Sequence, residues 1–258
     1  MTVGRNVDRA EIAKFEALAH RWWDPNGDFK ALHDINPLRV DYVKARCELQ
    51  GAAVVDVGCG GGILTESLAS LGAEVTGIDA AGGPLSVARL HAIESGLEGA
   101  FSRGARGGTP RRTKIRYLAA SPEEFVEEER EAFSVVTCLE MLEHVPDMAS
   151  TVRALAGLAA PGGDVVMSTI NRNPKAYALA VLGAEYILGL LPRRTHDYAK
   201  FIRPAELARA VRDAGLDLIA IDGMRYNPFT RRCTLTSDVD VNYLLHARKP
   251  AQGSGVFR

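Results

Sequence analysis

Apolar residues between positions 53 and 170 fall into short runs that alternate with stretches of helical spacing. Four runs end at glycine or polar residues, as buried strands do: AVVDVG, AEVTGID, FSVVTCL and GGDVVMSTI. Three stretches between them have helical character: GGILTESLASLG, PLSVARLHAIESG and DMASTVRALAGLAAPGG. Another helix and strand follow Pro204. This alternation predicts an α/β fold with a doubly wound, mostly parallel sheet and helices on both faces.

The N-terminal region has a different pattern. Residues 8–24 place Ile12, Phe15, Leu18 and Trp22 at helical spacing. Asp8 followed by Glu11 is typical of a helix start, and INPLRVDYVKARC predicts a turn that leads into a second helix. We predict an amphipathic helix packed on the core, whose paired tryptophans also serve as a lid over a pocket. Residues 1–50 are therefore expected to form an N-terminal helical extension and residues 51–250 the main domain.

Composition narrows the functional classes. The 258-residue chain has 31 basic and 32 acidic residues, so its charge gives no reason to expect a nucleic-acid partner. The four cysteines form no CxxC pair, which disfavours a structural zinc site and favours a reducing compartment such as the cytoplasm. The first residues lack a signal-peptide core, and no window offers the ~18 apolar residues that a membrane-spanning helix needs.

The stretch VVDVGCGGG places a glycine-rich turn between the first strand and its helix. Gly58 and Gly60 fit a dinucleotide fingerprint, but Ile63 occupies its third glycine position, so NAD is disfavoured. The acid-x-Gly-x-Gly-x-Gly order from Asp56, with Asp79 ending the next strand, resembles motif I of class I S-adenosylmethionine methyltransferases. That resemblance implies that Asp79 accepts hydrogen bonds from ribose hydroxyls. A plain tight turn is the alternative for the glycines alone.

Three titratable residues follow the buried strand in VVTCLEMLEHVPD: Glu140, Glu143 and His144. Their spacing predicts that they share one face of a helical turn. Ligands of doubly wound sheets bind beyond the carboxyl ends of the strands, which is where this cluster is expected to lie. Capping of the turn by Glu143 and His144, with Glu140 in solvent, is the structural alternative.

Further segments resemble a narrower family, the ubiquinone biosynthesis O-methyltransferases, over roughly residues 6–248. They are IAKFEALAHRWWDPNGDFKALHDINPLR, DVGCGGGILTESLA, CLEMLEHVPD, PGGDVVMSTINRN, GAEYILG, THDYAKFI and VDVNYLLHA. The family methylates 2-polyprenyl-6-hydroxyphenol and 3-demethylubiquinol. Its S-adenosylmethionine contacts fall by motif on Arg39, Gly58, Asp79 and Leu139. The resemblance also implies peripheral attachment to the inner membrane and membership of a ubiquinone-biosynthesis protein complex.

Methylating a phenol requires that its hydroxyl lose a proton, because a phenol has a pKa near ~10. His144 fits a general base, a role that histidine fills more often than any other residue. Alternatively, Glu140, Glu143 and His144 hold a divalent metal, for which the resemblance implies Mg²⁺, and the metal lowers the pKa of a bound catechol oxygen. Both schemes remain open from the sequence.

Two segments differ from the rest. The basic loop 99–114, GAFSRGARGGTPRRTK, has the character of an insertion, and AAGG at 80–83 replaces a segment expected to carry a bulkier residue near the ribose. Residues 171–201 contain the apolar stretch AYALAVLGAEYILGLL, flanked by five cations: Arg172, Lys175, Arg193, Arg194 and Lys200. Three interpretations of this insertion stand: a core helix, a lid over the substrate, or an element that contacts an anionic membrane surface.

Two other functions compete with O-methylation of polyprenylated phenols. One is methylation of a soluble small molecule, and the other is non-catalytic binding of S-adenosylmethionine. The WW pair, THDYAKFI and the apolar insertion favour the polyprenylated substrate over the soluble one. The cluster of Glu140, Glu143 and His144 favours catalysis over mere binding.

Overall fold

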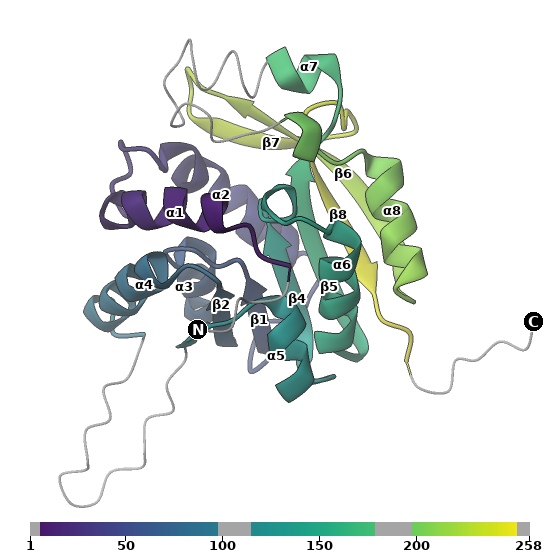
Figure 1. Cartoon of the computed structure of the whole chain (residues 1–258), viewed down its shortest axis with the longest axis horizontal. Helices are drawn as coiled ribbons and strands as arrows, with labels where there is room; N and C mark the ends of the chain where they lie inside the picture. Colours follow the sequence, from purple (N-terminus) through teal and green to yellow (C-terminus); the bar gives the residue numbers. More distant parts are fainter. Residues whose placement is uncertain (1–5, 98–114, 179–197, 252–258) are drawn as a thin grey trace, which may run out of the picture.

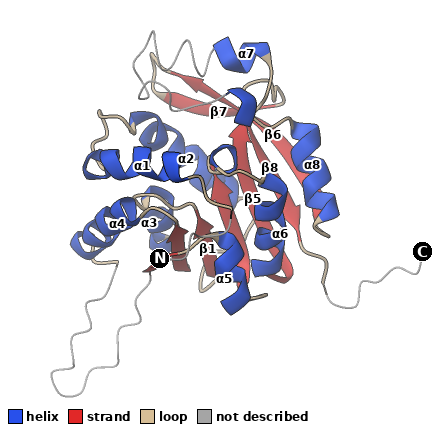
Figure 2. Cartoon of the chain, in the orientation of Figure 1, coloured by secondary structure: helices blue, strands red, loops and turns tan. Residues whose placement is uncertain are grey.

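A single mixed sheet forms the centre of the molecule (Figures 1 and 2). The computed structural model describes residues 6–97, 115–178 and 198–251. Eight strands lie in the order β3-β2-β1-β4-β5-β8-β6-β7. The strands are β1 (Ala53–Val57), β2 (Glu74–Asp79), β3 (Ile115–Ala119), β4 (Phe133–Leu139), β5 (Ala159–Ile170), β6 (Asp217–Asn227), β7 (Arg232–Thr236) and β8 (Asn242–Arg248). The first five in spatial order run parallel and the last three antiparallel, which confirms the predicted fold class.

Helices cover both faces of the sheet, and each face has its own apolar core. The helices are α1 (Arg9–Leu18), α2 (Lys30–Lys44), α3 (Ile63–Ser70), α4 (Gly82–Glu94), α5 (Pro122–Glu128), α6 (Met148–Leu158), α7 (Pro174–Ala176) and α8 (Pro204–Asp213). One core joins the sheet to α6 and α8 through Leu155 and Leu207, and the other joins it to α3 and α4 through Leu68 and Leu85. A sheet buried on both faces explains why its central strands are mostly apolar.

The four predicted strands and their helices are present, but one boundary is wrong. The helix expected over residues 147–163 ends at Leu158, and Ala159 already has extended backbone angles. Pro161 and Gly162 lie within the irregular start of β5, where the register shifts against β4. Three strands, β3, β7 and β8, were not predicted. β3 and β7 are short and expose part of their side chains, whereas β8 is buried but was noted only within the segment VDVNYLLHA.

The N-terminal helices differ in detail from the expectation. Asp8 caps α1 by accepting hydrogen bonds from the backbone of Ala10 and Glu11, as predicted. Instead of the predicted turn, α2 begins at Lys30 and includes Pro37 in its interior. In Figure 1, α1 and α2 lie above α3 and α4, and α1 contacts α4 directly.

Much of the two unusual segments lies outside the described residues, namely 98–114 and 179–197. In the described part of 171–201, three of the flanking cations have carboxylate partners. Arg172 pairs with Glu206, Lys175 with Asp238 and Asp240, and Lys200 with Asp8 and Glu11. Among the described helices, none is long and apolar enough to cross a bilayer.

Candidate functional site

A cavity opens at the carboxyl ends of β1, β2 and β4, where the sequence pattern placed the ligand site. The four residues that the resemblance assigns to S-adenosylmethionine all line it: Arg39, Gly58, Asp79 and Leu139. Asp56 and Gly60 of the glycine motif, which we also expected at the cofactor, line it as well. His144 and Glu140 also line it, whereas Glu143 is absent from the lining. The cavity therefore brings together residues from the first helical region and from three strand ends.

The glycine loop needs its glycines for two reasons. Gly58 and Gly60 have φ values of +71° and +53°, in the left-handed region that side chains rarely adopt. A Cβ on Gly60 would also collide with the indole of Trp22, which lies directly over the loop. Trp22 is buried and lines the cavity. Trp22 therefore lies over the glycine loop, and the lid role of the tryptophan pair stays a prediction.

Trp23 connects the glycine loop to helix α4. Its indole nitrogen donates to the carbonyl of Gly61 at 2.8 Å. Its ring stacks on His91 of α4, with centroids 3.4 Å apart and planes 3° apart. The His91 Nδ1 in turn lies 2.8 Å from the Glu66 carboxylate. The chain after α1 is therefore attached both to the glycine loop and to the helix that follows β2.

Asp79 joins the glycine loop to the start of α4. Its Oδ2 accepts from the backbone N–H of Gly60 at 2.9 Å, and its Oδ1 accepts from that of Ala81 at 2.8 Å. Burial raises the pKa of Asp79, although both backbone hydrogen bonds act in the opposite direction. Each oxygen keeps a second lone pair with which it can accept from a ligand hydroxyl.

Asp56 has a more structural environment. Its carboxylate accepts from Thr65 Oγ1 at 2.6 Å and from Thr137 Oγ1 at 2.8 Å, both buried. These bonds connect β1 to α3 and β4 beneath the glycine loop. Burial raises the pKa of Asp56, while both threonine hydroxyls lower it. The residue lines the cavity, and each of its oxygens accepts a hydrogen bond from a threonine hydroxyl.

Arg39 and Glu140 form an ion pair at the edge of the cavity. The Arg39 side chain is 6% exposed, and burial lowers its pKa to about 10. Its Nε is buried and finds no acceptor among the described residues, so the guanidinium keeps donor capacity for a further anion. Glu140 is fixed by Ser168, whose hydroxyl donates to Oε1 at 2.7 Å and accepts from the Glu140 backbone at 3.0 Å.

The expectation that Glu140, Glu143 and His144 share one face of a helical turn is wrong. Glu140 has φ +50°, so the chain reverses before the short 3₁₀ turn Leu142–His144 begins. Glu143 points into the core, where Thr169 Oγ1 donates to its Oε2 at 2.9 Å. His144 instead lies beside α1, with its Nδ1 3.1 Å from Glu11 Oε2.

Glu11 is the site residue that sequence reasoning assigned to another role. It was interpreted as part of a helix cap, but its side chain is buried and lines the cavity. A signal was present: Glu11 falls on the same helical stripe as Phe15, Leu18 and Trp22. A carboxylate on an apolar stripe needs partners when buried, and that pattern could have identified it.

These positions do not fit a shared metal. The three carboxylate and imidazole groups of Glu140, Glu143 and His144 each bond to a different protein partner. Among the described residues, the group of potential ligands whose atoms lie within 4.8 Å of one another is Cys47, Asp164 and His246, elsewhere in the fold. Glu140, Glu143 and His144 therefore do not form a shared metal site at the cavity.

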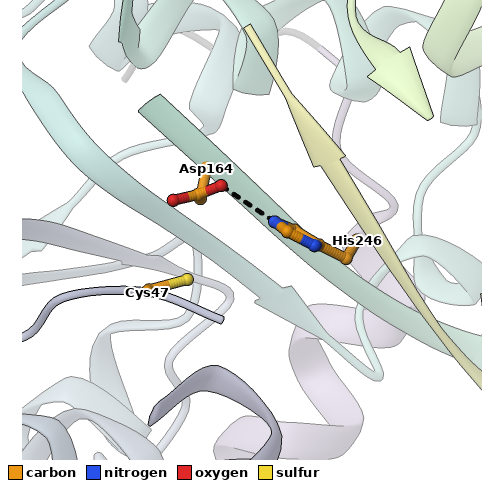
Figure 3. Close-up of side chains that lie close together, drawn as sticks. All are labelled: Cys47, Asp164 and His246. Atoms are coloured by element: carbon orange, nitrogen blue, oxygen red, sulfur yellow. Dashed lines mark hydrogen bonds and ion pairs between the residues drawn. The ribbon is translucent and has the colours of Figure 1, made fainter. Parts of the chain in front are cut away.

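The Cys47, Asp164 and His246 group has a structural explanation (Figure 3). Asp164 accepts from His246 Nε2 and from Arg248 Nε, both at 2.8 Å, so a cation already compensates its charge. Burial raises the pKa of the Cys47 thiol to about 12, and the Asp164 charge acts in the same direction. A protonated thiol beside an arginine-paired carboxylate is a poor metal site.

Comparisons with known proteins identify the family of this chain. A family model described as a methyltransferase domain matches residues 17–221. A ubiquinone biosynthesis O-methyltransferase of Stutzerimonas stutzeri is 57% identical over 95% of this chain and 98% of its own length. One of Pseudomonas syringae pv. tomato is 56% identical over 95% and 99%.

Solved structures of lower identity share the fold. Magnesium protoporphyrin IX methyltransferase of Synechocystis PCC 6803, solved with bound SAH, has a TM-score of 0.61 at 20% identity and covers 93% of this chain and 99% of its own. A methyltransferase of Thermotoga maritima has a TM-score of 0.63 at 14% identity, with coverages of 93% and 99%. At these identities the likeness supports the fold alone.

Proposed function

Because this chain belongs to the ubiquinone biosynthesis O-methyltransferases, we propose that it methylates a ring hydroxyl of two polyprenylated substrates, 2-polyprenyl-6-hydroxyphenol and 3-demethylubiquinol. S-adenosylmethionine is the methyl donor. The observation that carries the residue assignments is the cavity itself, where Arg39, the glycine loop and Asp79 meet His144. The cavity is lined mainly by apolar side chains around these few polar groups, as is usual for sites that bind small organic ligands.

The donor is held by residues of the cavity floor. Asp79 accepts from the ribose hydroxyls through the lone pairs that its backbone bonds leave open. Arg39 binds the methionyl carboxylate while Glu140 keeps the guanidinium oriented. Gly58 has no side chain and lets the ligand approach the backbone. Leu139 provides an apolar contact at the end of β4. Asp56 stabilises the glycine loop through its bonds to Thr65 and Thr137. Gly60 stabilises it through its backbone bond to Asp79.

His144 removes the phenolic proton. The phenolate oxygen then attacks the methyl carbon, forming the new C–O bond as the C–S bond breaks, and the proton on His144 returns to solvent. The protein contributes alignment of the two substrates and a proton acceptor, which are the two things this displacement requires. Phe15 contacts His144 edge to face, with centroids 5.2 Å apart, and keeps its ring beside the cavity.

The direct test is methyl transfer from labelled S-adenosylmethionine to a short-chain prenyl catechol, with a catechol that lacks the tail as comparison. We expect transfer to both, with a preference for the prenylated compound. Equal rates would favour the soluble-substrate alternative, and an absence of transfer would favour non-catalytic binding. Addition of EDTA is expected to leave the rate of methyl transfer unchanged. A loss of activity in EDTA would instead support a metal-dependent scheme.

Replacing Asp79 by alanine is expected to weaken S-adenosylmethionine binding about 10- to 100-fold, because a charged hydrogen-bond acceptor is worth roughly 1.5–3 kcal/mol. Isothermal titration calorimetry measures the affinity, and circular dichroism checks that the fold is kept. Glu74→Ala, at the exposed opposite end of β2, is the control and should bind normally. Unchanged affinity in folded Asp79→Ala would remove Asp79 from the binding site.

Peripheral contact with the inner membrane surface supplements this proposal. A polyprenyl tail is poorly soluble in water, and the apolar stretch within 171–201 is a candidate for the contact. In the described part of the segment, Arg172, Lys175 and Lys200 already pair with carboxylates. Arg193 and Arg194 are therefore the cations to test. Membership of a ubiquinone-biosynthesis protein complex would bring the same tail-bearing substrates to the cavity.

We expect the protein to sediment with phosphatidylglycerol vesicles more than with neutral vesicles, and less as salt rises, because the screening length is ~10 Å at 0.1 M. Arg193→Glu/Arg194→Glu should abolish most of the difference, since each cation near an anionic surface contributes ~1 kcal/mol. Binding that persists in the double variant would place the contact elsewhere, with the basic loop 99–114 the next candidate. Equal, negligible sedimentation with both lipids would argue against membrane contact.

A further inference from the structure

We propose that Glu11 is a positioning residue for His144: its carboxylate selects the imidazole tautomer and orientation in which Nε2 accepts the phenolic proton. This inference rests on the proposed function, in which His144 is the proton acceptor. It assigns a task to the N-terminal helix beyond that of covering the cavity. The two residues are 133 positions apart in the sequence and meet only in the fold.

The contact between the two side chains is buried and directional. Glu11 Oε2 lies 3.1 Å from His144 Nδ1, and the side chains are 9% and 12% exposed respectively. Phe15, one helical turn after Glu11 on α1, contacts the imidazole edge to face, with the ring planes 86° apart. One helix thus provides both a hydrogen-bond acceptor for one ring nitrogen and an aromatic wall for the ring.

The two oxygens of Glu11 have different partners. Oε2 is used by His144, whereas Oε1 accepts from Lys14 Nζ at 3.0 Å and from Lys200 Nζ at 3.1 Å. Burial alone would raise the pKa of Glu11. The hydrogen bonds from His144, Lys14 and Lys200 outweigh it and hold the pKa well below its ordinary value. Glu11 is therefore a carboxylate at neutral pH and does not take up the proton.

An ionised carboxylate can only accept hydrogen bonds, so it requires an N–H at His144 Nδ1. A neutral imidazole carries one proton, and placing it on Nδ1 leaves Nε2 as the basic nitrogen. When Nε2 takes the phenolic proton, the imidazolium that forms lies next to the negative charge of Glu11. The arrangement has the same logic as the carboxylate that orients the histidine of a Ser-His-Asp triad.

A merely structural role for Glu11 makes a different prediction. In that case Glu11 would anchor α1 over the cavity through Lys200 and His144, and its loss would weaken all functions of the cavity together. A positioning role affects only the step in which the proton is removed. The acidity of the substrate separates the two, because a phenol that is already ionised needs no base.

The experiment compares Glu11→Gln with the wild-type enzyme on two substrates at pH 8: a short-chain prenyl catechol and a nitro-substituted catechol that is ionised at that pH. The amide can donate to Nδ1 and favour the wrong tautomer. We expect kcat on the prenyl catechol to fall at least ~10-fold, since the same exchange in a Ser-His-Asp triad costs ~10⁴-fold. KM for S-adenosylmethionine should stay within about 2-fold, and kcat on the ionised catechol should be nearly unchanged.

Two further variants complete the test. Glu16→Gln, on the same helix, loses a carboxylate that accepts from the backbone of Gly83 at 3.0 Å and does not line the cavity, so it should match the wild type on both substrates. Glu11→Asp keeps the charge and should recover part of the kcat lost in Glu11→Gln. An equal loss on both catechols in Glu11→Gln, or no loss on either, would overturn the inference.

The same variants distinguish the positioning role of Glu11 from the proposed function on which it rests. Full activity of Glu11→Gln with an inactive His144→Ala would overturn the positioning role alone. Full activity of His144→Ala would overturn both the base and its positioning residue. A wild-type protein that methylates neither catechol would overturn the proposed function itself.

Discussion

Replacing His144 by alanine is expected to lower kcat on a prenyl catechol by ~10²–10⁴-fold at pH 7, the usual effect of removing a general base. Affinity for S-adenosylmethionine should change little, because His144 is proposed to handle the phenolic proton and the donor is bound at the glycine loop. Single-turnover methyl transfer measures the first quantity and calorimetry the second. A loss of donor affinity as large as the loss of kcat would instead indicate that the cavity has collapsed.

Glu143 provides the matched comparison for this variant. It is the neighbouring titratable residue, but it points into the core, with Thr169 as its partner and its Oε1 buried without a hydrogen bond among the described residues. Glu143→Gln should therefore retain kcat within a few-fold. If Glu143→Gln were inactive while His144→Ala turned over normally, the roles assigned to the two residues would have to be exchanged.

The parts of the site that could be predicted from the sequence are those determined by local backbone geometry. The glycine turn and Asp79 follow from strand–turn–helix patterns that a short stretch carries by itself, and the cavity forms where they meet. The parallel strands β1, β2, β4 and β5 were predicted for the same reason, since each is a mostly apolar run. The end of the helix at Leu158 was misplaced because AAPGG has no apolar periodicity.

The remaining parts depend on pairs that are distant in sequence. Arg39 meets Glu140 across 101 residues, and Glu11 meets His144 across 133. No local pattern specifies these partners, so the spacing of Glu140, Glu143 and His144 suggested one cluster where the fold makes three separate contacts. A single left-handed residue, Glu140, redirects the chain after β4 and separates the three side chains.

The ion pair of Arg39 and Glu140 gives the largest expected effect on stability. Glu140→Ala leaves a buried guanidinium without its counterion, and breaking a buried pair in this way costs about 3–5 kcal/mol. For a domain of this size, that corresponds to a fall in melting temperature of very roughly 6–20 °C, at about 2–4 °C per kcal/mol. Differential scanning calorimetry of the ligand-free protein measures it.

Glu140→Gly separates the lost charge from the backbone strain. Both variants remove the carboxylate, but glycine adopts the left-handed conformation at φ +50° without the cost of about 1 kcal/mol that alanine bears there. The glycine variant should therefore be the more stable of the two by about that amount. The reverse order would mean that the observed backbone conformation is not the one populated in solution.

Ligand binding tests whether Arg39 binds the carboxylate of the methyl donor. If its guanidinium binds the carboxylate of the donor, S-adenosylhomocysteine supplies the anion that Glu140→Ala has lost, since the product keeps the same amino-acid moiety. A ligand that binds only the folded state stabilises it by mass action, so saturating product should raise the melting temperature of Glu140→Ala at least as much as that of the wild type. Arg39→Ala should show a much smaller rise. Equal rises in the wild type and Arg39→Ala would separate Arg39 from the donor and leave it as the buried counterion of Glu140 alone.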